Sequence, residues 1–115
     1  MYSLQYHKTI TPERWRKYLA GQQLLMIGNE LNRLINCIKH GFDESEYIIG
    51  MEKTIELVDL TVESQAGNLR KELLRWRELF VENYIYEGSL ATRLPILESL
   101  YKVLLLLDSK SALVL

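Results

Sequence analysis

The sequence has little of what stabilises small secreted proteins or spans a membrane. Cys37 is the only cysteine among 115 residues, so the chain cannot form an intramolecular disulfide. We therefore expect a reducing, cytoplasmic setting. The longest uninterrupted apolar run, residues 103–107, has five residues, whereas a membrane-spanning helix needs about 20. Residues 1–11 also lack the apolar stretch of a secretory signal peptide.

Histidine, glycine-rich loops and excess charge are also scarce. Neither His7 nor His40 follows a glutamate by three residues, so the Glu-x-x-His pairs of di-iron bundles are absent. Gly21 and Gly28 lack the downstream Lys-Ser/Thr of a phosphate-binding loop. A net charge of −1 argues against a general nucleic-acid binder. We accordingly expect no cofactor and no nucleic-acid partner.

The charge is distributed unevenly along the chain. Residues 1–40 contain six Lys or Arg against two Glu, which gives +4. Residues 41–66 contain seven Asp or Glu against one Lys, which gives −6, and the remainder gives +1. Opposite charges on neighbouring helices help to set their pairing. The length is that of one domain, residues 1–115.

Apolar residues at helical spacing are abundant. Residues three or four apart share one face of a helix, so each such ladder predicts a helix with a buried stripe. The ladders are Leu24, Ile27, Leu31, Leu34 and Ile38; Ile48, Met51, Ile55, Val58 and Val62; Leu69, Leu73, Trp76, Phe80 and Tyr84; and Leu94, Leu97, Tyr101 and Leu104. The connections are short, so we predict an all-α protein, an antiparallel four-helix bundle with a short extra N-terminal helix.

Capping residues indicate where these helices begin. Thr11 followed by Pro12 starts a short helix that we expect to reach residue 20 and to continue into one ending near residue 39. Asp43, with Glu46 three residues later, starts a helix to about residue 64. A fourth helix is predicted over 69–87. The last follows a cap at residue 89 or 92 and places Pro95 in its first turn.

Four acids follow one face of the predicted third helix. Carboxylate oxygens at such spacing can hold a metal ion if ligands converge from other elements. A solvated face, or one that pairs with Arg70, Arg77 or the basic first helix, is the more common arrangement. The acids are Glu52, Glu56, Asp59 and Glu63.

Arg33 and His40, with six residues between them, resemble the Arg–His motif of HEPN-type ribonucleases. The resemblance implies that Arg33 stabilises phosphate charge and that His40 acts as acid or base. The residue after the arginine is Leu34 here, where that family has a polar residue. The more common role of such a histidine is to interact with the helix dipole. An HEPN-like ribonuclease is therefore an alternative.

Three asparagines and the cysteine lie on the same predicted helix. Asn29, Asn32 and Asn36 lie beside its apolar stripe, where we expect them to bond to a neighbouring helix rather than to a ligand. A single free thiol such as Cys37 is usually a small buried apolar group.

Residues 30–41, the segment IELVDLT at 55–61 and the segment LLRWRE at 73–78 resemble a group of small uncharacterised prokaryotic helical-bundle proteins. In that group a helix, a short Gly-acid turn and a helix ending in Leu-Asp-Leu-Thr follow one another. The same order of elements is similar to that of flagellar export chaperones of the FliS type. Both resemblances imply a fold and neither implies an activity.

The last predicted helix differs from the others because apolar residues fill the gaps in its ladder. A helix that is apolar all round needs cover, which a second subunit supplies most simply. We therefore predict a non-enzymatic helical bundle that mediates protein–protein interaction, as a homodimer or with a helical protein partner. The expected partner-binding residues are Leu100, Val103, Leu105, Leu106, Leu107, Leu113, Val114 and Leu115.

Overall fold

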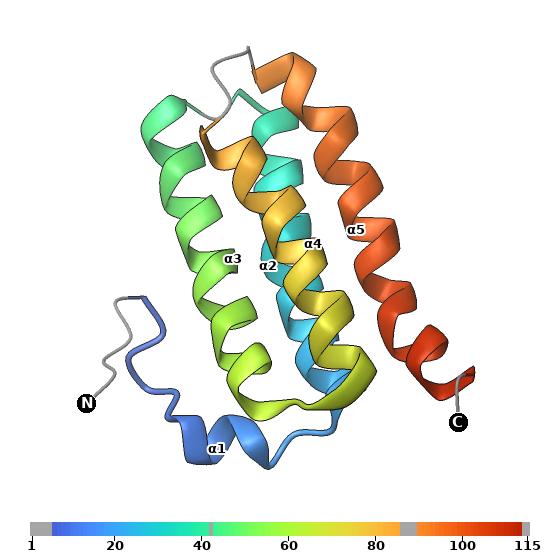
Figure 1. Cartoon of the computed structure of the whole chain (residues 1–115). Coiled ribbons are helices and arrows are strands. Elements are labelled where there is room, and N and C mark those ends of the chain that lie inside the picture. The colour runs from blue at the N-terminus through green and yellow to red at the C-terminus, as the bar shows by residue number, and fades with distance from the viewer. Residues whose placement is uncertain (1–5, 42, 86–89, 114–115) are drawn as a thin grey trace.

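The computed structural model describes residues 6–41, 43–85 and 90–113, and these ranges contain helices and no strand (Figure 1). The predicted all-α class is therefore confirmed for them. No helix within these ranges is long and apolar enough to cross a membrane. The five helices are α1 (Pro12–Arg16), α2 (Ala20–Lys39), α3 (Glu44–Ser64), α4 (Gly67–Ile85) and α5 (Leu90–Leu113).

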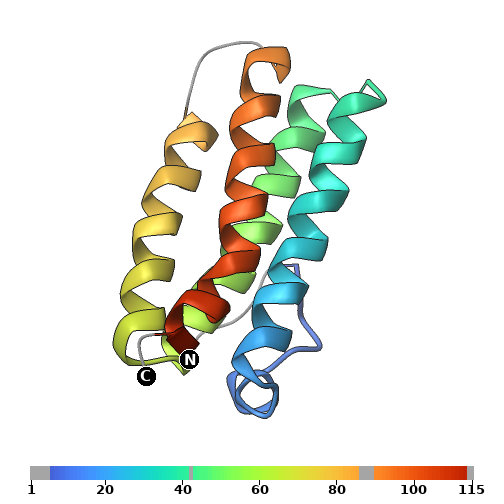
Figure 2. The same ribbon diagram turned by 90° about the vertical axis from the view of Figure 1, so that its right-hand side faces the viewer.

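The four long helices pack around one apolar core. α2 packs against α3 and α5, and α4 packs against the same two helices (Figures 1 and 2). The short helix α1 packs against α3 at one end of the molecule. The ladder predicted for α2 and the first four residues of the ladder predicted for α4 face this core, as the burial of Leu31 and Trp76 illustrates. The side chain of Tyr84, the last residue of the α4 ladder, lies outside the described residues.

The predicted caps of α1 and α3 are confirmed. The Thr11 hydroxyl accepts a hydrogen bond from Arg14 N at 3.2 Å, and the Asp43 carboxylate accepts one from Glu46 N at 2.9 Å. Gly41, which follows α2, has a φ of 91°, a left-handed conformation that favours glycine.

The predicted boundary between the first two helices is wrong. α1 ends at Arg16 instead of reaching residue 20, and the break lies at residues 17–19 rather than at Gly21. The buried amide of Gln23 bonds across the break. Its Nε2 donates to Trp15 O at 2.8 Å, and its Oε1 accepts from Ser64 Oγ at 3.0 Å. Trp15 O also accepts from Tyr18 N at 3.1 Å, so the turn that ends α1 and the Gln23 amide bond the same carbonyl.

Two other expectations are corrected. α5 begins at Leu90, so Pro95 lies in its second turn and not its first. In α3, Ile48 is partly exposed and the buried positions include two threonines, Thr54 and Thr61. Both hydroxyls donate to the backbone carbonyl one turn earlier, at 2.9 Å, so that burial leaves neither unpaired.

Candidate interaction surface on α4 and α5

The inner side of α5 belongs to the protein's own core. Leu97, Leu100, Leu104 and Leu107 repeat at helical spacing and are buried. Leu100 and Leu107 were expected on the partner-binding surface, but in the structure they pack against the other helices. The neighbouring helices alone bury this side of α5. The surface available to a partner is therefore narrower than the sequence predicted.

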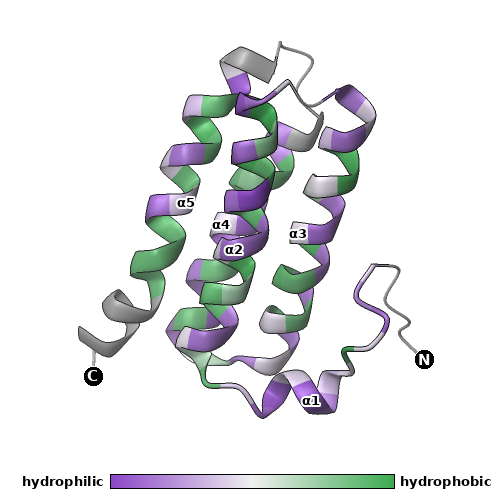
Figure 3. Cartoon of the chain, turned by 180° about the vertical axis from the view of Figure 1, so that it is seen from behind, coloured by the Kyte–Doolittle hydropathy of each residue, from purple (hydrophilic) through white to green (hydrophobic). Residues whose placement is uncertain are grey.

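A second set of apolar side chains on α5 is exposed. The exposed fractions are 46% for Ile96, 39% for Val103 and 52% for Leu106. These residues, which we call the α5 stripe, are seven and three positions apart and therefore share one face. Leu105 is also exposed but lies beside α2, where its Cδ2 is 3.4 Å from the position of a Cβ built on Gly28. Figure 3 shows apolar residues along much of α5.

The remaining residues of the predicted surface lie at the C-terminal end. The backbone of Leu113 ends α5, but the described side chains do not extend to it. Val114 and Leu115 lie outside the described residues. Val103, Leu105 and Leu106 are therefore the predicted residues that the structure leaves exposed, and Ile96 joins the surface without having been predicted.

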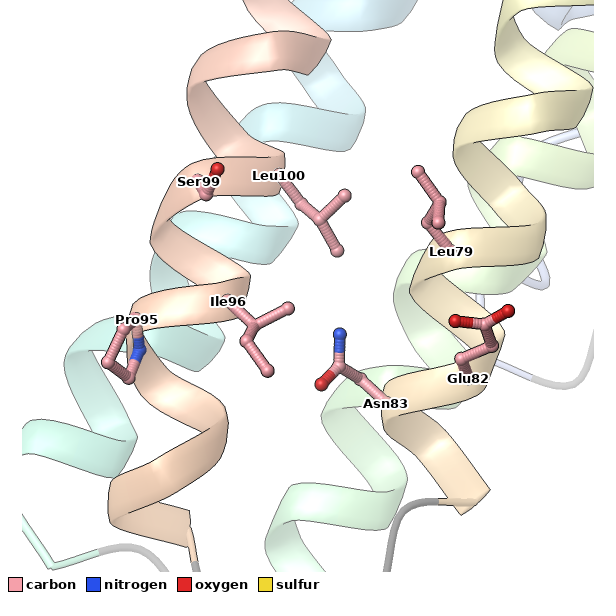
Figure 4. Close-up of a pocket in the computed structure, with 7 residues that line it drawn as sticks. All are labelled: Leu79, Glu82, Asn83, Pro95, Ile96, Ser99 and Leu100. Atoms are coloured by element: carbon pink, nitrogen blue, oxygen red, sulfur yellow. The ribbon is translucent and has the colours of Figure 1, made fainter.

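α4 extends this surface across a pocket of about 460 Å³ between α4 and α5 (Figure 4). Leu79 of α4 is exposed and forms one wall, while Ile96 and Leu100 form the other. One buried polar side chain, Asn83, projects from α4 into the space between them. The lining residues are Leu79, Glu82, Asn83, Pro95, Ile96, Ser99 and Leu100.

Buried contacts fix both ends of this pocket. Trp76 Nε1 donates to Leu100 O at 2.8 Å and thereby joins α4 to α5. At the other end, the Tyr47 hydroxyl donates to Asn83 O at 3.0 Å, and the Arg93 guanidinium lies 4.8 Å from the centre of the Tyr47 ring. Burial raises the pKa of Tyr47, an effect that the charge of Arg93 opposes. Arg93 also pairs with Glu44 at 2.9 Å.

The acidic face of α3 lies elsewhere, and its carboxylates are bonded to other parts of the chain. Glu56 is buried and accepts from His7 N at 2.8 Å, with His7 Nδ1 at 2.9 Å. Glu52 accepts from the Tyr6 hydroxyl at 2.7 Å. These two acids therefore hold the N-terminal segment against α3.

The other two acids of that face form ion pairs. Asp59 lies 2.6 Å from Arg77 Nε, and Glu63 lies 3.7 Å from Arg16 of the first helix. These pairs are of the kind expected for a structural acidic face. Within residues 6–41, 43–83 and 92–107, no three His, Cys, Asp or Glu side chains form a group that could hold a metal ion.

Arg33 and His40 are brought to one face of α2, where both line an open hollow of about 500 Å³. Arg33 is mostly exposed and lies 3.5 Å from Glu30, while His40 Nδ1 lies 2.6 Å from Asn36 O. The three asparagines line the same hollow and are exposed, so the expectation that they bond to a neighbouring helix is wrong. Cys37 adjoins them and is half-buried.

Sequence reasoning missed Asn83 as a site residue. From the sequence, we placed Tyr84, four positions after Phe80, in the apolar ladder of α4. In the structure it is Asn83, three positions after Phe80, that is found buried. The spacing of the preceding rungs, at 69, 73, 76 and 80, alternates four and three and would place position 83 on the core side. A polar residue at that position was the available signal.

No protein-family model, curated protein or solved structure matches the chain. The function is therefore inferred from the geometry described above.

Proposed function

We propose that this protein is a non-enzymatic helical bundle that associates with a second copy of itself through the α5 stripe and Leu79. In this proposal, α2–α5 form an antiparallel four-helix bundle, with α1 as a short extra helix. The order in which the helices pack and the short connections between them support that arrangement. The cytoplasmic setting expected from the single cysteine is part of the same proposal.

The exposed apolar stripe is the observation that carries the proposal. Burial of apolar surface contributes about 25 cal/mol per Å². Covering about 600 Å² in a dimer would contribute about 15 kcal/mol, against which stand association costs of about 4–15 kcal/mol together with side-chain ordering and desolvation. An isologous two-fold contact places the same patch of both copies together, as a self-complementary apolar stripe requires.

The charge of the surface is compatible with self-association. The exposed residues beside the stripe and the pocket include both signs, Lys102 on α5 and Glu82 on α4. A second copy therefore does not meet a uniform field of like charge. The net charge of the whole chain, −1, is too small to oppose association.

Light scattering on Leu106→Glu tests the proposal. The wild-type protein is expected to have twice the mass of one chain, and the variant the mass of one chain, because a carboxylate cannot be buried in an apolar contact without a partner. Ile49→Glu is the matched control, since Ile49 is exposed on α3, across the core from α5. A wild-type protein that is monomeric, or a control that dissociates equally, contradicts the proposal.

A ribonuclease of the HEPN type is the second candidate. It is favoured by the observation that Arg33 and His40 line the same hollow. The purified protein is incubated with RNA beside the double variant Arg33→Ala/His40→Ala. Cleavage by the wild-type protein alone would support this activity. If there is no cleavage, or if the double variant cleaves equally, this candidate is excluded.

A further inference from the structure

The pocket between α4 and α5 combines apolar walls with one buried polar group. Leu79 stands on one wall, and Ile96 and Leu100 stand on the other (Figure 4). Its volume of about 460 Å³ lies within the range of about 300–1,000 Å³ that small-molecule sites occupy. A mostly apolar lining with a single convergent polar group is also the usual composition of such sites.

Asn83 is that polar group, and within the described residues its carboxamide has no hydrogen-bond partner. The side chain is only 5% exposed, and Figure 4 shows it pointing from α4 into the pocket. The interaction that Asn83 makes is through its backbone, whose carbonyl accepts from the Tyr47 hydroxyl. A carboxamide offers two donors and an acceptor, and the polar atoms of Asn83 are not fully buried, so a ligand that enters the pocket can reach them.

The backbone that carries Asn83 is also held in place before any ligand arrives. Asn83 lies on a helix, and its carbonyl is fixed by Tyr47, which the Arg93 guanidinium covers. One turn earlier, Phe80 is buried and stacks on Trp76 with ring centres 5.0 Å apart. A ligand would therefore not have to order this end of the pocket, which lowers the entropic cost of binding.

We propose that this pocket binds a small, mostly apolar molecule with one neutral hydrogen-bonding end, of the phenol class. The ring lies between Leu79 and the aliphatic side chains of Ile96 and Leu100. The hydroxyl meets Asn83, where it can donate to Oδ1 and accept from Nδ2. The carboxylate of Glu82 at the same pocket disfavours an anionic ligand. The proposal does not depend on self-association.

The test compares p-cresol with toluene, which has the same shape without the hydroxyl, by NMR titration of isotope-labelled protein. p-Cresol is expected to shift the Asn83 side-chain amide signals and the backbone signals of Ile96 and Ser99. It should bind about two- to tenfold more tightly than toluene, the advantage that one net hydrogen bond provides. The titration is run on the wild-type protein and on Leu106→Glu, in which the pocket is free of any second copy.

Asn83→Leu should abolish the preference for p-cresol, whereas Asn32→Leu, a change of the same kind on the surface of α2, should leave it intact. The wild-type comparison stands by itself if Asn83→Leu does not fold. The proposal is overturned if p-cresol shifts none of the pocket signals in either protein, or if it binds no better than toluene. A wild-type dimer with no p-cresol shifts in either protein would overturn this inference alone, and a wild-type monomer that binds p-cresol would overturn only the proposed association.

Discussion

α3 and α5 lie across the core from one another, but within the described residues the chain covers the outer surface of only one of them. Residues 6–16 lie along α3 (Figure 1). Tyr6 and His7 bond to carboxylates of α3, and Trp15 Nε1 donates to Thr61 Oγ1 at 3.0 Å. No segment of the described chain covers the α5 stripe in this way, and its apolar side chains remain exposed.

The difference lies in the chemistry of the two surfaces. The cover on α3 is directional, because Glu52, Glu56 and Thr61 each meet a specific partner from the N-terminal segment. The α5 stripe offers no such groups, and apolar burial is non-directional. Specific hydrogen bonds tie a segment of the same chain to α3, whereas the stripe suits any apolar surface of matching shape, including its own copy.

The largest expected effect comes from removing the buried anchor of the covered side. Trp15 is fully buried and bonded to Thr61, so Trp15→Ala should lower the free energy of unfolding by about 3–5 kcal/mol. Leu106→Ala on the uncovered side should change the stability of the monomer by less than about 0.5 kcal/mol. Urea denaturation at low protein concentration measures both. Similar losses in the two variants would mean that the stripe is already buried.

A smaller effect is expected from the carboxylate that holds the N-terminal segment. Glu56→Gln removes the charge that faces His7, whose Nδ1 lies 2.9 Å from the Glu56 carboxylate. The change should cost about 1–3 kcal/mol of unfolding free energy and increase hydrogen exchange at residues 6 and 7. Glu63→Gln is the control on the same helix, because its ion pair with Arg16 is exposed and should contribute less than about 1 kcal/mol. Equal losses of unfolding free energy in both variants would contradict the conclusion that Glu56 holds the N-terminal segment in place.

The smallest effect concerns the exposed cap of α3. Hydrogen bonds from Glu46 N and the Ser45 hydroxyl hold the pKa of Asp43 below its ordinary value of 3.8. The folded-state pKa is depressed, so the stabilisation is complete above the unfolded value and is lost as the pH falls through the folded one.

Asp43→Asn tests this effect, because it keeps an uncharged cap and removes the titrating group. The melting temperature of the wild-type protein should therefore fall further than that of Asp43→Asn when the pH is lowered below 3.8. Identical pH profiles for the two proteins would contradict the assignment.

The helices were predicted well because the patterns that mark them, capping residues and apolar spacing, involve only residues close together in the sequence. Asp43 with Glu46 gave the start of α3, and the ladder that includes Leu31 gave the buried face of α2. The break after Arg16 could not be predicted in this way. The contacts there include the amide of Gln23, which also bonds Ser64, a residue 41 positions away.

The candidate surface was predicted only in part. The density of apolar residues in the last helix indicated that some would remain exposed, and Val103, Leu105 and Leu106 are. Which of them are exposed depends on how α5 is rotated about its own axis against α2 and α4. Because apolar residues occur on nearly every side of this helix, their spacing in the sequence does not indicate that rotation. For the same reason Leu100 and Leu107 could not be assigned to the core from sequence.

The central claim is that a second copy covers the α5 stripe. Sedimentation velocity of the wild-type protein and of Leu106→Glu, each over a series of concentrations, tests it most directly. The claim predicts that the wild-type protein sediments as a dimer and approaches monomer on dilution, while Leu106→Glu remains a folded monomer throughout. A wild-type protein that sediments as a monomer at every concentration would contradict it.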